Sequence, residues 1–148
     1  MLFWSFKIKM IYKYPDKVLL RPSEDVTLEE GKDVDNRLRR EIRDLKWGTV
    51  AGLAAPQIGI NKNVFIAMGK TYLNPKITFY NKETEIKNEG CYSLKENKFD
   101  YKIERAKTIK MTWQDLKGQI KEGFFSGVQS QILQHEYDHL LGKLCCGA

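Results

Sequence analysis

The sequence predicts an α+β fold in which antiparallel β-sheets surround a central C-terminal helix, with one amphipathic helix nearer the N-terminus. Short segments rich in β-branched and aromatic residues fill the middle of the chain, separated by Gly, Asn and Asp. Helical spacing of apolar residues precedes and follows this region. Few strand–helix–strand alternations are present, which argues against a parallel sheet.

The N-terminal part is expected to be irregular. Residues 10–26 should form an extended arm, because Pro15 and Pro22 interrupt any helix. Residues 1–9 are apolar and aromatic, but the stretch is too short for a signal peptide and has no small-residue cleavage site. We expect them to be an extension in front of a more ordinary start at Met10.

The first helix is predicted from spacings of four, four and three residues between Val34, Leu38, Ile42 and Leu45. These side chains would form one apolar face, with several arginines outside it. Gly48 is expected to end the helix.

The strands are predicted at residues 63–68, 71–75, 76–80, 98–104, 108–113 and 119–125. The last two are joined by a turn signal at residues 115–118 (DLKG). A final helix should run from near Ser126 to Leu141 and end at Gly142. It should direct Val128, Ile132 and Leu133 toward the core.

Size and composition limit the classes of function that the chain can have. The 148 residues suit one domain spanning 1–148, and no run approaches a membrane span. The net charge of +6 would favour polyanions such as ribosomal RNA, yet no nucleic-acid motif appears, so we expect neither a membrane nor a specific nucleic-acid partner. Cys91, Cys145 and Cys146 make a poor disulfide framework, which favours a reducing cytoplasm.

The most informative segment is HEYDH at residues 135–139. Two histidines four residues apart on a helix lie on one face, so His135 and His139 can reach one metal ion. Glu136 can then take a proton from a water molecule on that ion. These are the only 2 histidines in the chain, which favours a metal site over two solvated histidines.

A catalytic site of this kind needs a third protein ligand and an open position for water. No His, Asp or Glu follows His139, so the third ligand lies upstream unless it is Cys145 or Cys146. Cys91 is the best candidate, because Gly90 lets the backbone approach closely. Taken alone, Cys91 would be better explained as a buried, inert thiol.

A third element is GLAAPQIG at residues 52–59. Its small residues are typical of a backbone that approaches another group closely, and Gln57 adds an amide donor. Taken alone, the segment is better explained as a tight loop with Gln57 in solvent.

Together, GLAAPQ, EGCYS and QHEYDHLLG, in this order and spacing, resemble the three signature motifs of peptide deformylase. The resemblance covers nearly the whole chain from Met10 and includes YPD near the N-terminus and the IERAKTIKM stretch. Three motifs in register are far more specific than one. The family removes the N-formyl group from the initiator methionine of nascent bacterial-type polypeptides and releases formate.

The resemblance implies that one divalent metal ion is held by Cys91, His135 and His139. Ferrous iron is the family's usual native ion, with nickel, cobalt or zinc as substitutes. Thiolate and imidazole ligands also suit zinc, so the residue types do not choose between these metals.

The catalytic roles follow by position in the family. Glu136 is expected to be the acid–base, and Gln57 and the backbone N–H of Tyr92 to donate hydrogen bonds to the oxyanion. The substrate would be a nascent formyl-Met polypeptide, met during transient contact with the ribosome. The location would be the cytoplasm of a bacterium, or of the bacterial host of a phage that encodes the chain.

Two sets of residues are expected to bind the peptide. An apolar slot for the methionine side chain would be walled by Val128, Gln131 and Ile132. The extended peptide backbone would pair, as an added strand, with Ala51, Gly52, Glu89 and Gly90.

The sequence departs from the family pattern near the substrate. Val50 replaces a usual glycine, Tyr92 a leucine, Lys98 an arginine, and Gln131 an apolar wall residue. The sequence also stops soon after the third motif, without the C-terminal helix that many bacterial members use at the ribosome. These differences bear on substrate preference and ribosome docking rather than on the metal ligands.

Two other functions are considered. A metal-dependent peptidase would commonly take its third ligand downstream, where this chain has no carboxylate or histidine. A binding or decoy protein could keep a structural metal, but structural zinc sites normally have four protein ligands. Three ligands together with Glu136 therefore favour catalysis.

Overall fold

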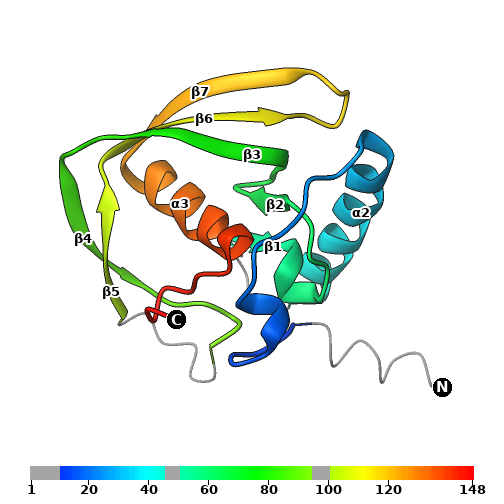
Figure 1. Ribbon diagram of the computed structural model, residues 1–148, viewed down its shortest axis with the longest axis horizontal. Coiled ribbons are helices and arrows are strands. Elements are labelled where there is room, and N and C mark those ends of the chain that lie inside the picture. Colours follow the sequence, from blue (N-terminus) through cyan, green and yellow to red (C-terminus); the bar gives the residue numbers. More distant parts are fainter. Residues whose placement is uncertain (1–10, 46–50, 95–100) are drawn as a thin grey trace.

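The computed structural model describes residues 11–45, 51–94 and 101–148. A five-stranded antiparallel sheet has the order β1-β2-β3-β6-β7, and β4 and β5 form a separate two-stranded ribbon. The strands are β1 (Gly52–Ala54), β2 (Val64–Ala67), β3 (Lys70–Tyr80), β4 (Thr84–Glu89), β5 (Tyr101–Ala106), β6 (Thr108–Gln114) and β7 (Ile120–Ser126). Helix α3 (Gly127–Leu141) lies between the sheet and the ribbon (Figure 1). The expected α+β fold, with antiparallel sheets around the C-terminal helix, is confirmed.

Helix α2 (Leu28–Asp44) begins earlier than the apolar spacing predicted. Thr27 and Glu30 form a capping box: the Thr27 hydroxyl accepts from the Glu30 backbone at 3.2 Å, and the Glu30 carboxylate accepts from the Thr27 backbone at 2.9 Å. Because of this cap, the helix begins at Leu28, before Val34, which is the first residue of the predicted apolar face. The helix ends at Asp44, and Gly48 lies outside the described residues.

Strand β2 lies between two clusters of the hydrophobic core. All of its residues are buried, and they alternate between two faces of the sheet. Val64 and Ile66 pack in the cluster that contains α2 residues, whereas Phe65 and Ala67 pack with α3. Because both faces are covered, the segment is continuously apolar rather than alternating.

The structure differs from the sequence prediction at strand β3. The two strands expected at residues 71–75 and 76–80 are one element, with irregular register against β6. Asn74 has a φ of 48°, a left-handed conformation that asparagine tolerates better than most residues. Its side-chain amide bonds both backbone polar groups of Val26, at 2.8 and 2.9 Å. The distortion therefore ties the N-terminal arm to the sheet.

The N-terminal arm carries one short 3₁₀ helix, η1 (Lys17–Leu19), and a second, η2 (Ala55–Ile58), follows β1. No strand was predicted for residues 84–89, which form β4. The sequence there, TEIKNE, is mostly polar because the ribbon buries little of it. The extension expected at residues 1–9 lies outside the described residues.

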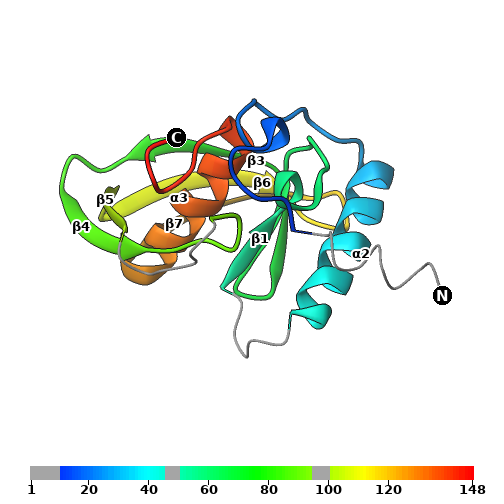
Figure 2. The ribbon, with the colours of Figure 1, turned by 90° about the horizontal axis from the view of Figure 1, so that it is seen from below.

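Helix α3 begins and ends as predicted, with Ser126 at its N-cap and Gly142 in a left-handed C-cap at φ 81°. Leu133 is fully buried, and Ile132 packs against the same cluster. The expectation that Val128 faces the core is wrong, because it lies in the exposed first turn and is 64% exposed. Figure 2 shows α3 again flanked by the sheet and the ribbon.

After α3 the chain turns back along the ribbon. Leu144 and Cys145 pack with Cys91 and Leu94 in a small apolar cluster, so this tail covers the segment after β4. Neither long helix of the described residues combines the length and apolar character needed to cross a membrane.

Candidate metal centre and catalytic site

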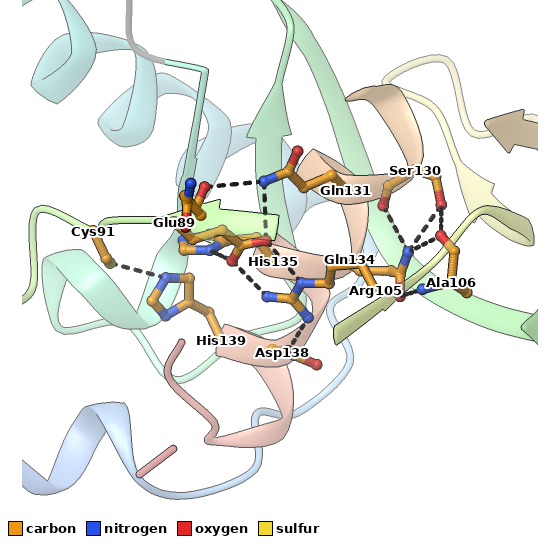
Figure 3. A network of polar contacts seen from close by, with 11 residues as sticks. Glu89, Cys91, Arg105, Ala106, Ser130, Gln131, Gln134, His135, Asp138 and His139 are labelled. Carbon is orange, nitrogen blue, oxygen red and sulfur yellow. Dashed lines mark hydrogen bonds and ion pairs between the residues drawn. The ribbon is translucent and has the colours of Figure 1, made fainter. Parts of the chain in front are cut away.

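Three side chains from two distant parts of the sequence, the segment after β4 and helix α3, meet at one place. One ligand atom each of Cys91, His135 and His139 lies within 4.8 Å of the others. The Cys91 sulfur is 3.4 Å from Nε2 of His139 (Figure 3). The two imidazole rings have centroids 5.1 Å apart, as expected for positions one helical turn apart.

The segment after β4 holds Cys91 in place by local and long-range contacts. The Leu94 backbone N–H donates to the Cys91 carbonyl at 3.0 Å, which closes a turn. Leu144 and Cys145 cover this turn from the tail. Cys91 is therefore buried, at 5% exposure, while its sulfur faces the histidines.

Glu136 is a buried carboxylate beside these groups. It is 3% exposed, and its Oε1 has no hydrogen-bond partner among the described residues. Burial raises the pKa of Glu136 to about 7, because removal from water disfavours the charged form. A buried carboxyl group with this pKa is suited to accept and return a proton near neutral pH.

Gly52 leaves the space that Glu136 occupies. A Cβ atom at this position would lie 2.6 Å from Oε2 of Glu136 and 2.8 Å from the carbonyl oxygen of Ile66. Both distances are well below van der Waals contact. Any side chain at position 52 would therefore displace the Glu136 carboxylate or the neighbouring strand.

Glu89 orients His135. Its Oε1 lies 2.8 Å from Nδ1 of His135 (Figure 3). Burial alone would raise the pKa of Glu89, but hydrogen bonds from Arg105 and His135 lower it to about 2. The carboxylate is thus ionised, accepts a hydrogen bond from Nδ1–H of His135, and leaves Nε2 of His135 for the metal site.

Arg105 anchors this arrangement and was not predicted from the sequence. Its guanidinium donates to both oxygens of Glu89, at 2.8 and 2.7 Å, and to Asp138 at 2.6 Å. Arg105 is only 5% exposed. One sequence signal existed: Tyr101, Ile103 and Arg105 alternate along β5, so an arginine takes an inward position after two apolar residues.

The Gln57 side chain faces the site, so the alternative interpretation, in which it lies in solvent, is wrong. It is 2% exposed, and its Oε1 accepts the Ala54 backbone N–H at 3.0 Å. Its Nε2 is consequently directed to Ser93, at 3.2 Å, and toward the Cys91 sulfur, at 3.4 Å. Ser93, fully buried, is a second residue that sequence reasoning did not single out.

A cavity of about 290 Å³ opens beside these groups. Its lining includes all the predicted site residues except Val128 and His139: Ala51, Gly52, Gln57, Glu89, Gly90, Cys91, Tyr92, Gln131, Ile132, His135 and Glu136. Asn88 also lines it. Val128 is not part of the lining, in agreement with its exposed position. Val50 and Lys98 lie outside the described residues.

The donor groups fit a divalent transition metal. A thiolate and two imidazoles are ligands shared by zinc and iron sites. The buried Glu136 carboxyl group, whose Oε1 has no partner among the described residues, lies at the same place. A second trio, Glu89, His135 and Cys145, also lies within 4.8 Å, but Arg105 and His135 already engage both Glu89 oxygens. The first trio is therefore the better metal site.

Comparison with known proteins identifies relatives over almost the whole chain. A family described as Polypeptide deformylase matches residues 8–147. The peptide deformylase of Thermotoga petrophila is 35% identical over 135 residues, covering 88% of this chain and 80% of the relative.

Solved structures of similar proteins have the same fold. A peptide deformylase from Thermotoga maritima has a TM-score of 0.80 and 34% identity, covering 90% of this chain and 92% of the other. A class I type b peptide deformylase from Acinetobacter baumannii, solved with Met-Ala-Ser bound, has a TM-score of 0.79 and 25% identity, with 90% and 93% covered.

Proposed function

The chain belongs to the polypeptide deformylase family, and we propose that Cys91, His135 and His139 hold the metal ion on which its reaction depends. That reaction is the hydrolytic removal of the N-formyl group from the terminal methionine of newly made polypeptides, with release of formate. The observation that carries the site assignment is the meeting of these three ligand atoms within 4.8 Å.

Glu136 is assigned as the acid–base. When bound, the metal ion would supply Lewis-acid chemistry, polarising the formyl carbonyl and acidifying a water molecule. The Glu136 carboxylate accepts a proton from that water and returns it to the leaving amine. Its pKa of about 7 in the metal-free protein lets it exist in both protonation states near neutral pH.

Gln57 and Tyr92 are assigned as donors to the oxyanion. The amide of Gln57 is held by the Ala54 backbone so that its N–H groups face the Cys91 side of the site. The Tyr92 backbone N–H immediately follows Cys91, and Tyr92 lines the cavity. Donors fixed before the reaction stabilise developing charge without reorganisation.

The peptide is assigned to the cavity. Its volume of about 290 Å³ suits one side chain and the adjoining peptide group rather than a large ligand. A peptide that begins with methionine is bound by a similar protein from Acinetobacter baumannii. We place the first side chain against Gln131 and Ile132, and the peptide backbone alongside Ala51, Gly52, Glu89 and Gly90.

Ferrous iron is proposed as the native ion, with zinc, nickel or cobalt as substitutes. A bacterial cytoplasm is proposed as the location, supported by three cysteines that are all free thiols. Transient contact with the ribosome would deliver the substrate.

An assay of the anaerobically purified, metal-analysed protein tests this function. With one ion per chain it should release formate from formyl-Met-Ala-Ser and leave the peptide bonds intact. Release of formyl-methionine and Ala-Ser without formate would indicate a peptidase instead. Full metal content with neither product would indicate a binding protein.

A further inference from the structure

Gln131 places an amide in the wall of the cavity, one helical turn before His135. Its Nε2 is 3.3 Å from Oε2 of Glu89 and 3.4 Å from the Asn88 carbonyl oxygen. Both partners are acceptors, which fixes the orientation of the amide, because the flipped form would set three oxygens against one another. Figure 3 shows the nitrogen toward Glu89 and the amide oxygen on the other side.

The Gln131 amide oxygen has no hydrogen-bond partner among the residues that the structure describes. Water can satisfy it while the cavity is empty of substrate. An apolar side chain that covers this oxygen removes its water and offers no donor in return, which weakens binding. A side chain with an N–H donor at the same depth would replace the lost water.

The rest of the lining distinguishes little between a methionine and a glutamine side chain. Among the described residues it includes Ala51, Ile132 and the ionisable site groups, and its exposed surface is mostly apolar. This surface can bury the unbranched stem of either side chain, so the Gln131 amide is the wall group that distinguishes their ends.

We propose that Gln131 determines specificity for the first residue of the peptide by accepting a hydrogen bond from its side chain. This inference rests on the proposed deformylase function and extends it. The slot is amphipathic, so formyl-glutaminyl peptides compete with formyl-methionyl peptides. Glutamine and methionine have similar length and are both unbranched, which makes the polar end the main difference between them.

The test compares kcat/KM for formyl-Met-Ala-Ser and formyl-Gln-Ala-Ser. Gln131→Leu should raise the Met-over-Gln ratio by about tenfold or more, the loss expected when a buried polar group is left without its partner. Gln129→Leu is the matched control, because Gln129 is exposed on α3 and does not line the cavity. The control should leave the ratio unchanged.

Metal content separates a specificity effect from damage to the site. Gln131→Leu removes one donor to Oε2 of Glu89, but Arg105 still donates to that oxygen at 2.8 Å. His135 should therefore stay oriented and metal content should stay at the parent level. Loss of metal in the Gln131 variant would overturn the specificity role and show a structural one.

Two further outcomes are decisive. An unchanged Met-over-Gln ratio in Gln131→Leu, or an equal change in Gln129→Leu, overturns the inference. If the metal-loaded parent hydrolyses neither peptide, the proposed function fails. Calorimetric binding of Met-Ala-Ser and Gln-Ala-Ser then tests Gln131 separately, with the same shift in ratio expected in the Leu variant.

Discussion

Glu136 has an unusual environment for a carboxylate, since it is buried and one of its oxygens has no partner among the described residues. Such a group costs free energy in the metal-free protein, because desolvation is not offset by hydrogen bonds. A nearby cation would reduce this free-energy cost by stabilising the charged form of the carboxylate. The same residue that is unfavourable for folding is thus suited to move a proton at the site.

Glu136→Gln is expected to keep the metal and lose turnover. The amide is isosteric but cannot accept a proton, so kcat/KM should fall about 10²–10⁴-fold. Formate release and metal content measured on the same sample check this. Parent-like turnover in a fully loaded variant would remove Glu136 from the mechanism.

Gly52→Ala is expected to impair the site by overpacking. Its methyl group would lie 2.6 Å from Oε2 of Glu136, next to a strand that cannot retreat easily. The stability loss should be about 1–3 kcal/mol by chemical unfolding, with a larger relative loss of kcat than of metal content. An alanine variant with unchanged stability and turnover would show that the carboxylate is not confined as described.

The two histidines and Glu136 could be predicted because helical periodicity alone places residues 135 and 139 on one face. Elimination of other residues made Cys91 the best candidate for the third ligand, but the resemblance to known motifs was needed to outweigh a buried, inert thiol. Its position depends on contacts with Leu144 and Cys145 far along the chain. Arg105 and Asp138 were missed because an ion pair between a strand and a helix leaves no local pattern.

At the scale of elements, α3 depends on its caps and on the ribbon beside it. Local signals sufficed to predict its ends, whereas the capping box of α2 and strand β4 were missed. Strand β4 is nearly all polar, so its pairing with β5 follows from topology rather than from hydrophobic alternation. Yet β4 carries Glu89 to His135, so the least recognisable strand supports the site.

Gly142→Ala should destabilise the protein through the C-cap of α3. Gly142 has φ 81°, and a Cβ there would lie 2.8 Å from the backbone at Leu20 and Arg21. We expect a loss of at least about 1–2 kcal/mol in thermal or urea unfolding. Gly147→Ala is the control, because its φ is also positive at 92° but no atom lies within 4 Å. Equal losses in the two variants would show that the packing contact contributes nothing.

Glu89→Gln should weaken metal binding and change stability in acid. The amide cannot hold Nδ1–H of His135 as strongly, so metal affinity should fall about 10–100-fold. The pKa of Glu89 is lowered from 4.5 to about 2, so its contribution is present above pH 4.5 and is lost as the pH falls toward 2. That contribution is on the order of 3 kcal/mol.

Urea unfolding of the metal-free parent and the variant between pH 5 and pH 2 measures this effect. The parent should lose its advantage over Glu89→Gln as the pH falls through this range. The exposed Glu83, which pairs with Lys107 at the surface, provides the control Glu83→Gln, which should follow the parent. A constant difference between parent and Glu89→Gln across the range would contradict the low pKa.

At the scale of the whole molecule, the metal site joins parts of the chain that local contacts do not. Cys91 belongs to the turn after the ribbon, whereas the two histidines belong to α3. An ion bound only by the folded chain stabilises it by linkage. Chelation should therefore lower the melting temperature, and reloading should restore it. A melting temperature unaffected by chelation at full metal loss would indicate that the ligands are held without the ion.

The position of the bound ion tests the central assignment most directly. In a crystal of the metal-loaded protein, anomalous scattering should place one ion bonded to the Cys91 sulfur and to one nitrogen each of His135 and His139, with a remaining position open to solvent. An ion bonded instead to Glu89, His135 and Cys145, or closed by a fourth protein ligand, would contradict it.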